Sequence, residues 1–225
     1  MLRTLLFVSV CAFFALTVAL ALVQPMKPVH VLQPGINSPI IGLEMAFHPF
    51  EIWNIIGDPQ TLAGQKARAG FTLGTWIDFG YILAYSLCYI LLTALLVYRQ
   101  QAHRGLLVFG VAAIAIAAAG DIAENLALFR ILDTGTESLI ETHMTNLVLS
   151  TRLKWIFLGV AGIPAIILFR REGRRGPAFI LTTAFALGVL GVLKQYAVEI
   201  MSLFLAFFWV YLFVKLLPLK NRWWA

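Results

Sequence analysis

The sequence predicts an all-α integral membrane protein, a bundle of about six transmembrane helices with a short helical cap on one side. Of its 225 residues, 60% are hydrophobic and only 12% are charged, and the mean hydropathy is +0.86. A soluble domain of this size could not bury so much apolar surface, so lipid is the expected solvent. Residues 1–225 are expected to form a single membrane domain.

Six apolar segments approach the 20 or so residues that a helix needs to cross a hydrocarbon core of about 30 Å. The fifth is short, and its Gly188 and Gly191 favour close packing against a neighbour. The predicted spans are 5–23, 72–97, 106–128, 153–169, 177–193 and 197–217.

The first span also resembles a signal peptide. Arg3 precedes its apolar stretch, and Ala19-Leu20-Ala21 is similar to a cleavage site. The apolar run of 5–23 is longer than an ordinary signal core, which favours a retained anchor over cleavage.

Residues 24–71 are predicted to lie outside the hydrocarbon core on the extracytoplasmic side. Four prolines keep the first part extended, and helical spacing begins at Ile40. Pro49 ends this stretch, a second runs over 50–56 as far as Gly57, and a third covers 61–69. Helices this short cannot span a bilayer, so they either lie on the outer surface or cap the bundle. A hairpin without a function of its own is the alternative.

The positions of the basic residues predict the orientation. With a cytoplasmic N-terminus, the inner segments carry ten Lys and Arg residues against one acid, Glu172, a net charge of +9. The outer half then carries −3, and the total is +6. Both termini are therefore expected in the cytoplasm, with Trp223 and Trp224 as interfacial anchors. Because the basic residues follow the ends of apolar runs, a nucleic-acid-binding surface is excluded.

Polar residues inside the spans suggest a site, because an ionised group at membrane depth is costly unless it is paired or hydrated. In the second span Asp78, Tyr81, Tyr85 and Tyr89 share one helical stripe, which is suited to a hydrogen-bonded lining. The alternative is an interfacial aspartate with ordinary packed tyrosines.

The third span holds the strongest signal, Gly120-Asp121-Ile122-Ala123-Glu124-Asn125. Asp121, Glu124 and Asn125 lie on one face of one turn. Two such acids repel each other if both ionise, so they require a cation, a shared proton or a metal. A frayed helix end in water is the alternative.

Lys154 is expected at a matching depth, with Arg152, Lys194 and Glu199 nearby. Asp78, Asp121, Glu124 and Glu199 against Lys154 leave three negative charges in excess. Either some carboxyls are protonated, or Arg152 and Lys194 join the group, or a cation binds. A structural salt-bridge cluster without a ligand remains open.

Other chemistry has little support in the sequence. Glu137, Glu141 and His143 in the expected outer loop 133–146 have poor spacing for a metal, and the two cysteines, Cys11 and Cys88, lie within apolar runs. No metal site is therefore predicted, and no cofactor is identified. Pro164 is expected to kink the fourth span.

Four ordered blocks carry a resemblance. They are Pro39-Ile40-Ile41-Gly42-Leu43-Glu44-Met45-Ala46, Asp78-Phe79 with Tyr85, Gly120 to Asn125, and Thr151-Arg152-Leu153-Lys154-Trp155. Together they resemble a group of small bacterial multi-pass membrane proteins with no assigned activity. The resemblance covers about 39–169 and implies that Glu44, Asp78, Asp121, Glu124, Asn125 and Lys154 belong together.

These observations predict a plasma-membrane protein, in contact with membrane lipids, with a carboxylate-rich cavity open to the outer side. The expected ligand-binding residues are Glu44, Asp78, Tyr81, Tyr85, Asp121, Glu124, Asn125 and Lys154. The expected ligand is a small polar or amphipathic molecule, such as a lipid headgroup, or a cation. The rival hypothesis is a non-catalytic accessory subunit that binds a protein partner. An enzyme that uses Glu124 as a general acid or base is a third.

Overall fold

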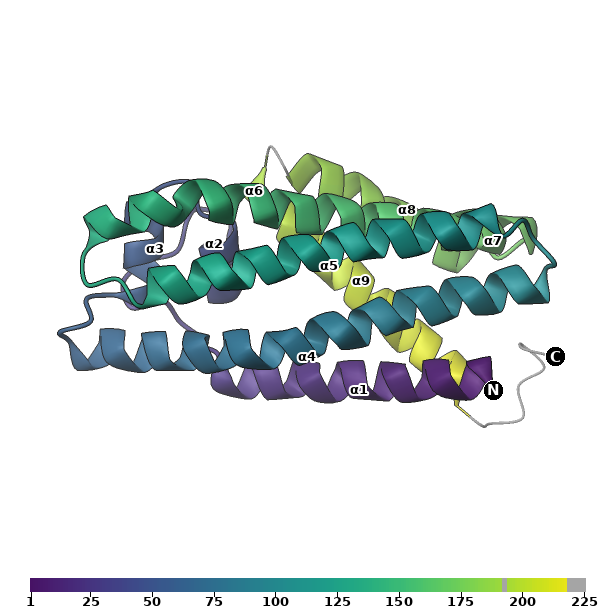
Figure 1. Cartoon of the computed structure of the whole chain (residues 1–225), viewed down its shortest axis with the longest axis horizontal. Coiled ribbons are helices and arrows are strands. Elements are labelled where there is room, and N and C mark those ends of the chain that lie inside the picture. Colours follow the sequence, from purple (N-terminus) through teal and green to yellow (C-terminus); the bar gives the residue numbers. More distant parts are fainter. Residues whose placement is uncertain (192–193, 218–225) are drawn as a thin grey trace.

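The computed structural model is all-helical over the part of the chain that it describes, residues 1–191 and 194–217. Most of the long helices run along one direction, one crosses the others obliquely, and short helices cover one end (Figure 1). The elements are α1 (Leu2–Val23), α2 (Pro39–Glu44), α3 (Pro49–Ile56), α4 (Leu62–Arg99), α5 (Gly105–Leu132), α6 (Glu137–Ala161), α7 (Ile163–Arg171), α8 (Arg175–Gly191) and α9 (Gln195–Leu216).

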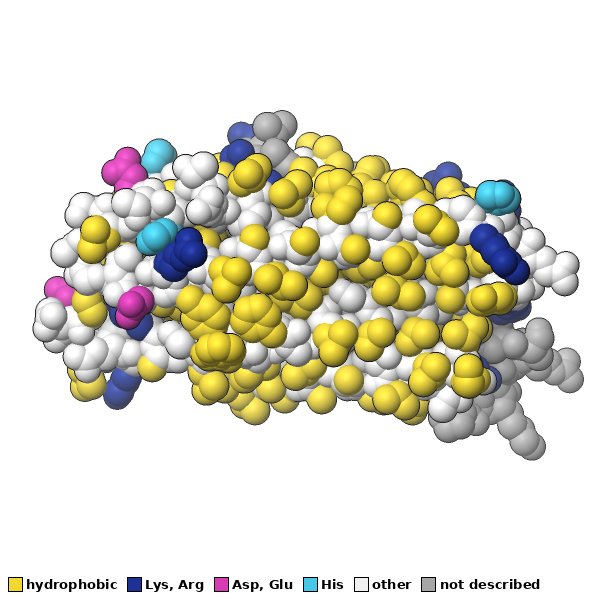
Figure 2. Space-filling view, in the orientation of Figure 1, with side chains coloured by type: hydrophobic (Ala, Val, Ile, Leu, Met, Phe, Trp, Pro, Cys, Tyr) yellow, Lys and Arg dark blue, Asp and Glu magenta, His cyan; other side chains and the backbone are white. Residues whose placement is uncertain are grey.

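The predicted membrane bundle is confirmed. Among the described residues, α1, α4, α5, α6 with its continuation α7, and α9 are long and apolar enough to cross a bilayer. Helix α8 has 17 residues and is apolar but shorter, about 25 Å long. In Figure 2 hydrophobic side chains cover the middle of the bundle, and the acidic side chains of this face lie at the end that carries α2 and α3.

Two ends of the bundle differ in charge. We call the end with α2 and α3 the cap end, and the opposite end, with the start of α1 and the end of α9, the basic end (Figure 1). Arg99 and Arg104 lie in the α4–α5 turn at the basic end, and Arg174 pairs there with Glu172 at 2.7 Å. Trp223 and Trp224, and the basic residues at 220 and 222 that were counted among the ten, lie outside the described residues.

The cap helices α2 and α3 pack on the bundle. Buried Leu43, Ile52 and Ile55 join side chains from the extensions of α4, α5 and α6 in one apolar cluster. Arg68 of α4 holds this end together, because its buried guanidinium donates to the carbonyl oxygens of Gly57, Leu132 and Thr134. Of the two placements left open, capping the bundle is therefore the one observed.

Two sequence-based boundaries were wrong. Residues 61–69 are not a separate helix, because Thr61 caps the start of a continuous 38-residue α4 with a bond from Gly64 N. The expected loop 133–146 is largely helical, since α6 already begins at Glu137. Both segments are more polar than the spans, yet they continue the same helices toward the cap, where their apolar side chains pack with those of α2 and α3. The end predicted for the fifth span, residue 193, lies outside the described residues.

Pro164 acts as expected on the fourth span. The helix is interrupted at Gly162, which ends α6 and precedes α7, and Pro164 occupies the first turn of α7. A proline cannot donate a backbone hydrogen bond, so it fits a first turn and breaks a continuous helix.

Candidate functional site

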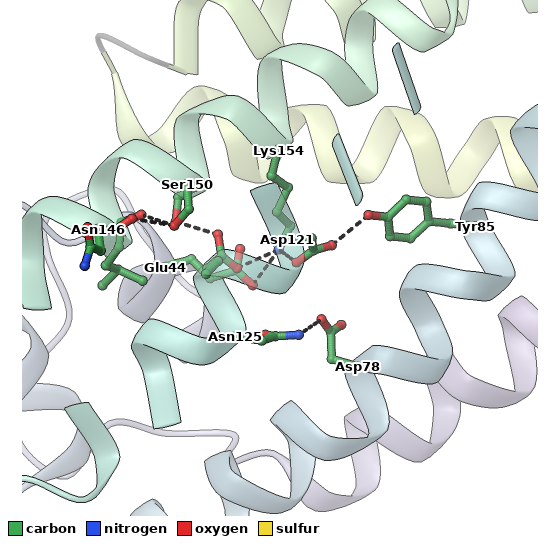
Figure 3. A network of polar contacts seen from close by, with 11 residues as sticks. Glu44, Asp78, Tyr85, Asp121, Asn125, Asn146, Ser150 and Lys154 are labelled. Carbon is green, nitrogen blue, oxygen red and sulfur yellow. Dashed lines mark hydrogen bonds and ion pairs between the residues drawn. The ribbon is translucent and has the colours of Figure 1, made fainter. Parts of the chain in front are cut away.

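A buried lysine on α6 organises the polar residues of the bundle. The Nζ atom of Lys154 lies 2.8 Å from Glu124 Oε1, 2.9 Å from Asp121 Oδ1 and 3.2 Å from Glu44 Oε1. Lys154 is only 6% exposed, and Asp121 and Glu124 are almost fully buried. Figure 3 shows these carboxylates, from α5 and α2, converging on one ammonium group.

Gly120 explains why α5 and α6 bring these groups so close. A Cβ atom at Gly120 would lie 2.9 Å from the backbone nitrogen of Lys154 and 3.0 Å from the carbonyl oxygen of Ser150. The absence of a side chain lets the two helices approach closely, as small residues do in membrane bundles. The short side chains of Asp121 and Glu124, one turn apart, can then reach the same ammonium group.

Neutral groups complete the network around the charges. Tyr85 donates its hydroxyl proton to Asp121 Oδ2 at 2.9 Å, and Thr151 donates to Glu124 Oε2. Asn125 donates its amide to Asp78 Oδ2 at 2.8 Å (Figure 3). Asp121 and Glu124 are thus held by Lys154 and a hydroxyl, whereas Asp78 is held by an uncharged amide.

Glu44 is the carboxylate that the cap contributes. Burial raises its pKa to about 7, and the nearby Asp121 and Asp78 add to that rise, while Lys154 opposes it. Its Oε2 atom is buried without a hydrogen-bond partner. Near neutral pH, Glu44 can therefore gain or lose a proton while its Oε1 atom lies against Lys154.

A cavity of about 620 Å³ adjoins this network, within the usual range for a small-molecule site. Its wall is formed by α1, α2, α4, α5, α6 and α9. Six of the eight predicted residues line it: Glu44, Asp78, Tyr81, Tyr85, Asp121 and Lys154. Glu124 and Asn125 are not lining residues; they lie behind the wall and hold Lys154 and Asp78.

The lining is unbalanced in charge. Four carboxylates, those of Glu44, Asp78, Asp121 and Glu199, share it with one cationic side chain, Lys154. The formal excess is three negative charges, and Glu124 adds a further carboxylate behind the wall. Even with Glu44 protonated, the formal charge of the described lining remains negative.

Aromatic rings form the part of the cavity farther from the cap. Phe13 of α1 stacks on Tyr81 with ring centres 5.0 Å apart and lies 5.7 Å from Trp209 of α9. Tyr89 meets Trp209 edge to face at 5.2 Å. Tyr81 also packs against Tyr85, and both line the cavity together with Tyr89, so the tyrosine stripe of α4 faces the cavity. Tyr81 is part of the wall and is not a hydrogen-bond partner of Lys154.

Two expected partners of the cluster lie elsewhere. The guanidinium of Arg152 lies 5.1 Å from the ring centre of Phe47, and Lys194 borders a separate hollow with His48 and Glu51. Both sit near the right depth, but Arg152 is two residues from Lys154 on α6 and therefore points to a different face. The possibility that they neutralise the cluster is thus wrong.

Glu199 has a role that the sequence did not indicate. Its carboxylate accepts bonds from the backbone nitrogens of Asn37 and Ser38, at 3.0 and 2.8 Å, at the start of α2. A carboxylate is favourable at a helix N-terminus, where backbone N–H groups lack partners. Ser38-Pro39 is typical of the start of a helix. The carboxylate that accepts from Ser38 N, however, lies 161 residues away in the sequence.

Trp209 was also missed, because an aromatic residue in a long apolar span gives no sign of lining a cavity. Tyr89 belonged to the predicted stripe but not to the predicted site. It is 4% exposed, lines the cavity, and its hydroxyl has no hydrogen-bond partner.

No group of three or more His, Cys, Asp and Glu side chains within residues 1–191 and 194–217 is arranged to hold a metal ion. Comparison of the chain with protein-family models, curated proteins and solved structures found no match.

Proposed function

We propose that the protein is a membrane-embedded binding protein whose cavity receives a ligand carrying a positively charged group. The observation that carries this proposal is the charge of the lining, four carboxylates against one lysine. Buried charges in such excess are strongly unfavourable unless a counter-charge or protons compensate them. A cationic guest supplies that counter-charge.

Asp78 is the residue best placed to meet the guest. Lys154 already contacts Glu44, Asp121 and Glu124, whereas Asp78 is bonded to the amide of Asn125. An amide orients a carboxylate but does not neutralise it. Asp78 is also only half-buried and lines the cavity, so its charge is accessible from there.

The proposed orientation places the cap end on the non-cytoplasmic side of a bacterial plasma membrane. It is supported by the basic residues in the turns at the basic end, which are typical of cytoplasmic loops. The ligand then arrives from outside, and Glu44 of the cap forms part of the wall that it meets.

Ethanolamine is a suitable probe, because it carries a protonated amine and little else. We expect the full chain in phosphatidylcholine nanodiscs to bind it, as measured by titration calorimetry. Asp78→Asn is expected to weaken binding about 10- to 100-fold, which corresponds to a charge-assisted hydrogen bond of 1.5–3 kcal/mol. Asp133→Asn, at an exposed position outside the cavity, is the matched control and should bind as the unmodified chain does.

Equal affinities in Asp78→Asn and in the control would contradict the proposal, provided that both variants elute as folded monodisperse protein. The charges would then act only in fixing helix positions, as in an accessory subunit. That alternative predicts that Asp121→Lys combined with Lys154→Asp restores folding, since the 2.9 Å pair is preserved in reverse. The binding protein predicts that this exchange does not restore ethanolamine binding.

A further inference from the structure

We infer that the ligand is a lipid with a protonated amine in its headgroup, and that it enters sideways between α1 and α9 from the half of the membrane nearer the cap. This inference rests on the proposed function and adds the hydrocarbon chain and the route. It follows from how these two helices meet, where the cavity separates them, and how its polar and apolar parts are arranged.

Helices α1 and α9 meet toward the basic end. Phe7 stacks on Phe213 with ring centres 5.8 Å apart, and Phe14 meets the same ring at 5.6 Å. Arg3 donates to the carbonyl oxygen of Leu216. Among the described residues, the aromatic contacts between the two helices reach no farther toward the cap than Phe14 on α1 and Trp209 on α9.

Beyond these contacts the cavity lies between the two helices. Leu20 and Ala21 of α1 line it, as do Ser202, Leu205 and Ala206 of α9. Ala21 and Ala206 are both exposed and both part of the lining, so we place the opening of the cavity between α1 and α9. Figure 1 shows α9 crossing the bundle obliquely, close to the start of α1 and away from its other end.

The opening lies at membrane depth. Ala206 is 11 residues from the start of α9 at Gln195, in the middle of this 22-residue apolar helix. An opening between two membrane-spanning helices at this depth faces lipid chains. A purely water-soluble ligand has no use for such an opening, whereas a lipid can move through it without leaving the membrane.

The interior of the cavity matches an amphipathic guest. Its acidic residues lie toward the cap, and the rings of Tyr89 and Trp209 lie deeper. A lipid from the leaflet nearer the cap has the same order, with its headgroup at the surface and its chain below. The structure therefore accommodates the lipid in the orientation that it already has in the membrane.

Two buried polar atoms lack partners beside this space. The Tyr89 hydroxyl and Glu44 Oε2 belong to lining residues that are at least nine-tenths buried, and neither atom has a hydrogen-bond partner. A buried polar group left unpaired costs about 1–3 kcal/mol, and at Glu44 Oε2, on the cap side of the cavity, a bound headgroup with N–H donors can recover this cost. A primary amine meets both this requirement and the negative charge of the lining.

Tryptophan quenching tests the inference on the full chain. The protein is reconstituted in phosphatidylcholine vesicles that contain a minor fraction of brominated phosphatidylethanolamine or, in parallel, brominated phosphatidylglycerol. Lipids around the bundle quench exposed tryptophans in both cases, but occupancy of the cavity adds quenching of the two lining tryptophans, Trp155 and Trp209. We expect the additional quenching to show a roughly tenfold higher affinity of the cavity for the amine-bearing lipid than for phosphatidylglycerol. One charge-assisted contact accounts for a difference of this size.

Two variants locate the effect. Ala206→Leu fills the opening and should remove the preference, whereas Ala115→Leu, an exposed alanine of α5 outside the lining, should leave it intact. Equal quenching by the two lipids, with ethanolamine binding still dependent on Asp78, would overturn the lipid inference and leave the proposed function standing. Preserved preference in Ala206→Leu would overturn the lateral route. If Asp78→Asn changed neither ethanolamine binding nor the preference for the amine-bearing lipid, both proposals would be overturned.

Discussion

Lys154 Nζ and Glu124 Oε1 lie 2.8 Å apart in the interior of the bundle, where both side chains are almost fully buried. This buried ion pair joins α6 to α5. Asp121 on the same face of α5 and Glu44 of the cap share the same ammonium group. The stability of three elements therefore depends on one lysine.

Lys154→Met should destabilise the protein by about 3–5 kcal/mol, because it leaves buried carboxylates without their counter-charge. Thermal unfolding in detergent measures the loss. Lys66→Met, the same change at an exposed position of α4, is the control and should shift the midpoint little. If the two variants unfold alike, the carboxylates are already neutral and Lys154 is not their essential partner.

Gly120→Ala is expected to cost about 1–3 kcal/mol, since the added methyl group meets backbone atoms of α6 that cannot rotate away. The same variant should weaken ethanolamine binding, because Asp121 moves with its helix. Gly135→Ala is the control, as a Cβ there meets nothing within 4 Å. A Gly120→Ala protein with unchanged unfolding and binding would show that α5 and α6 are farther apart than described.

The raised pKa of Glu44 gives the stability a pH dependence. A carboxyl that shifts from 4.5 to about 7 on folding binds more protons in the folded state between these values. The stability that it contributes is therefore present below pH 4.5 and is lost as the pH rises through 7, about 3 kcal/mol in all.

Unfolding midpoints measured across this pH range should fall for the unmodified chain and change less for Glu44→Gln. The charged groups that face Glu44 are Asp121, Glu124, Asp78 and Lys154, which both proteins retain. Glu141→Gln, at an exposed site on α6, should keep the full slope. A slope that survives in Glu44→Gln would assign the effect to another group.

The orientation can be tested with single cysteines in a chain whose Cys11 and Cys88 are replaced by alanine. Ser138 is an exposed residue of α6 at the cap end, and His103 is an exposed residue of the turn between α4 and α5 at the basic end. Each is replaced by cysteine, as Ser138→Cys or His103→Cys. A membrane-impermeant maleimide added to intact cells should label Ser138→Cys only. Labelling of His103→Cys alone would reverse the proposed orientation.

The sequence by itself determined the fold class, the approximate spans, and most of the polar residues that come together. Long apolar runs have few alternatives to a transmembrane helix, because backbone polar groups must be paired within the segment in lipid. Costly residues within those runs, such as Asp121 and Lys154, stand out for the same reason. The spacing of Asp78, Tyr81, Tyr85 and Tyr89 likewise defined one face of one helix.

Only the tertiary structure decided which residues face the cavity and which support it. Helical spacing places Asp121 and Glu124 on one face of α5, but the position of α4 puts the first in the lining and the second behind it. The bond from Ser38 N to Glu199 and the meeting of α1 with α9 join residues far apart along the chain. Such contacts depend on how helices cross, and the period of a single helix contains no information about the angle or depth at which another meets it.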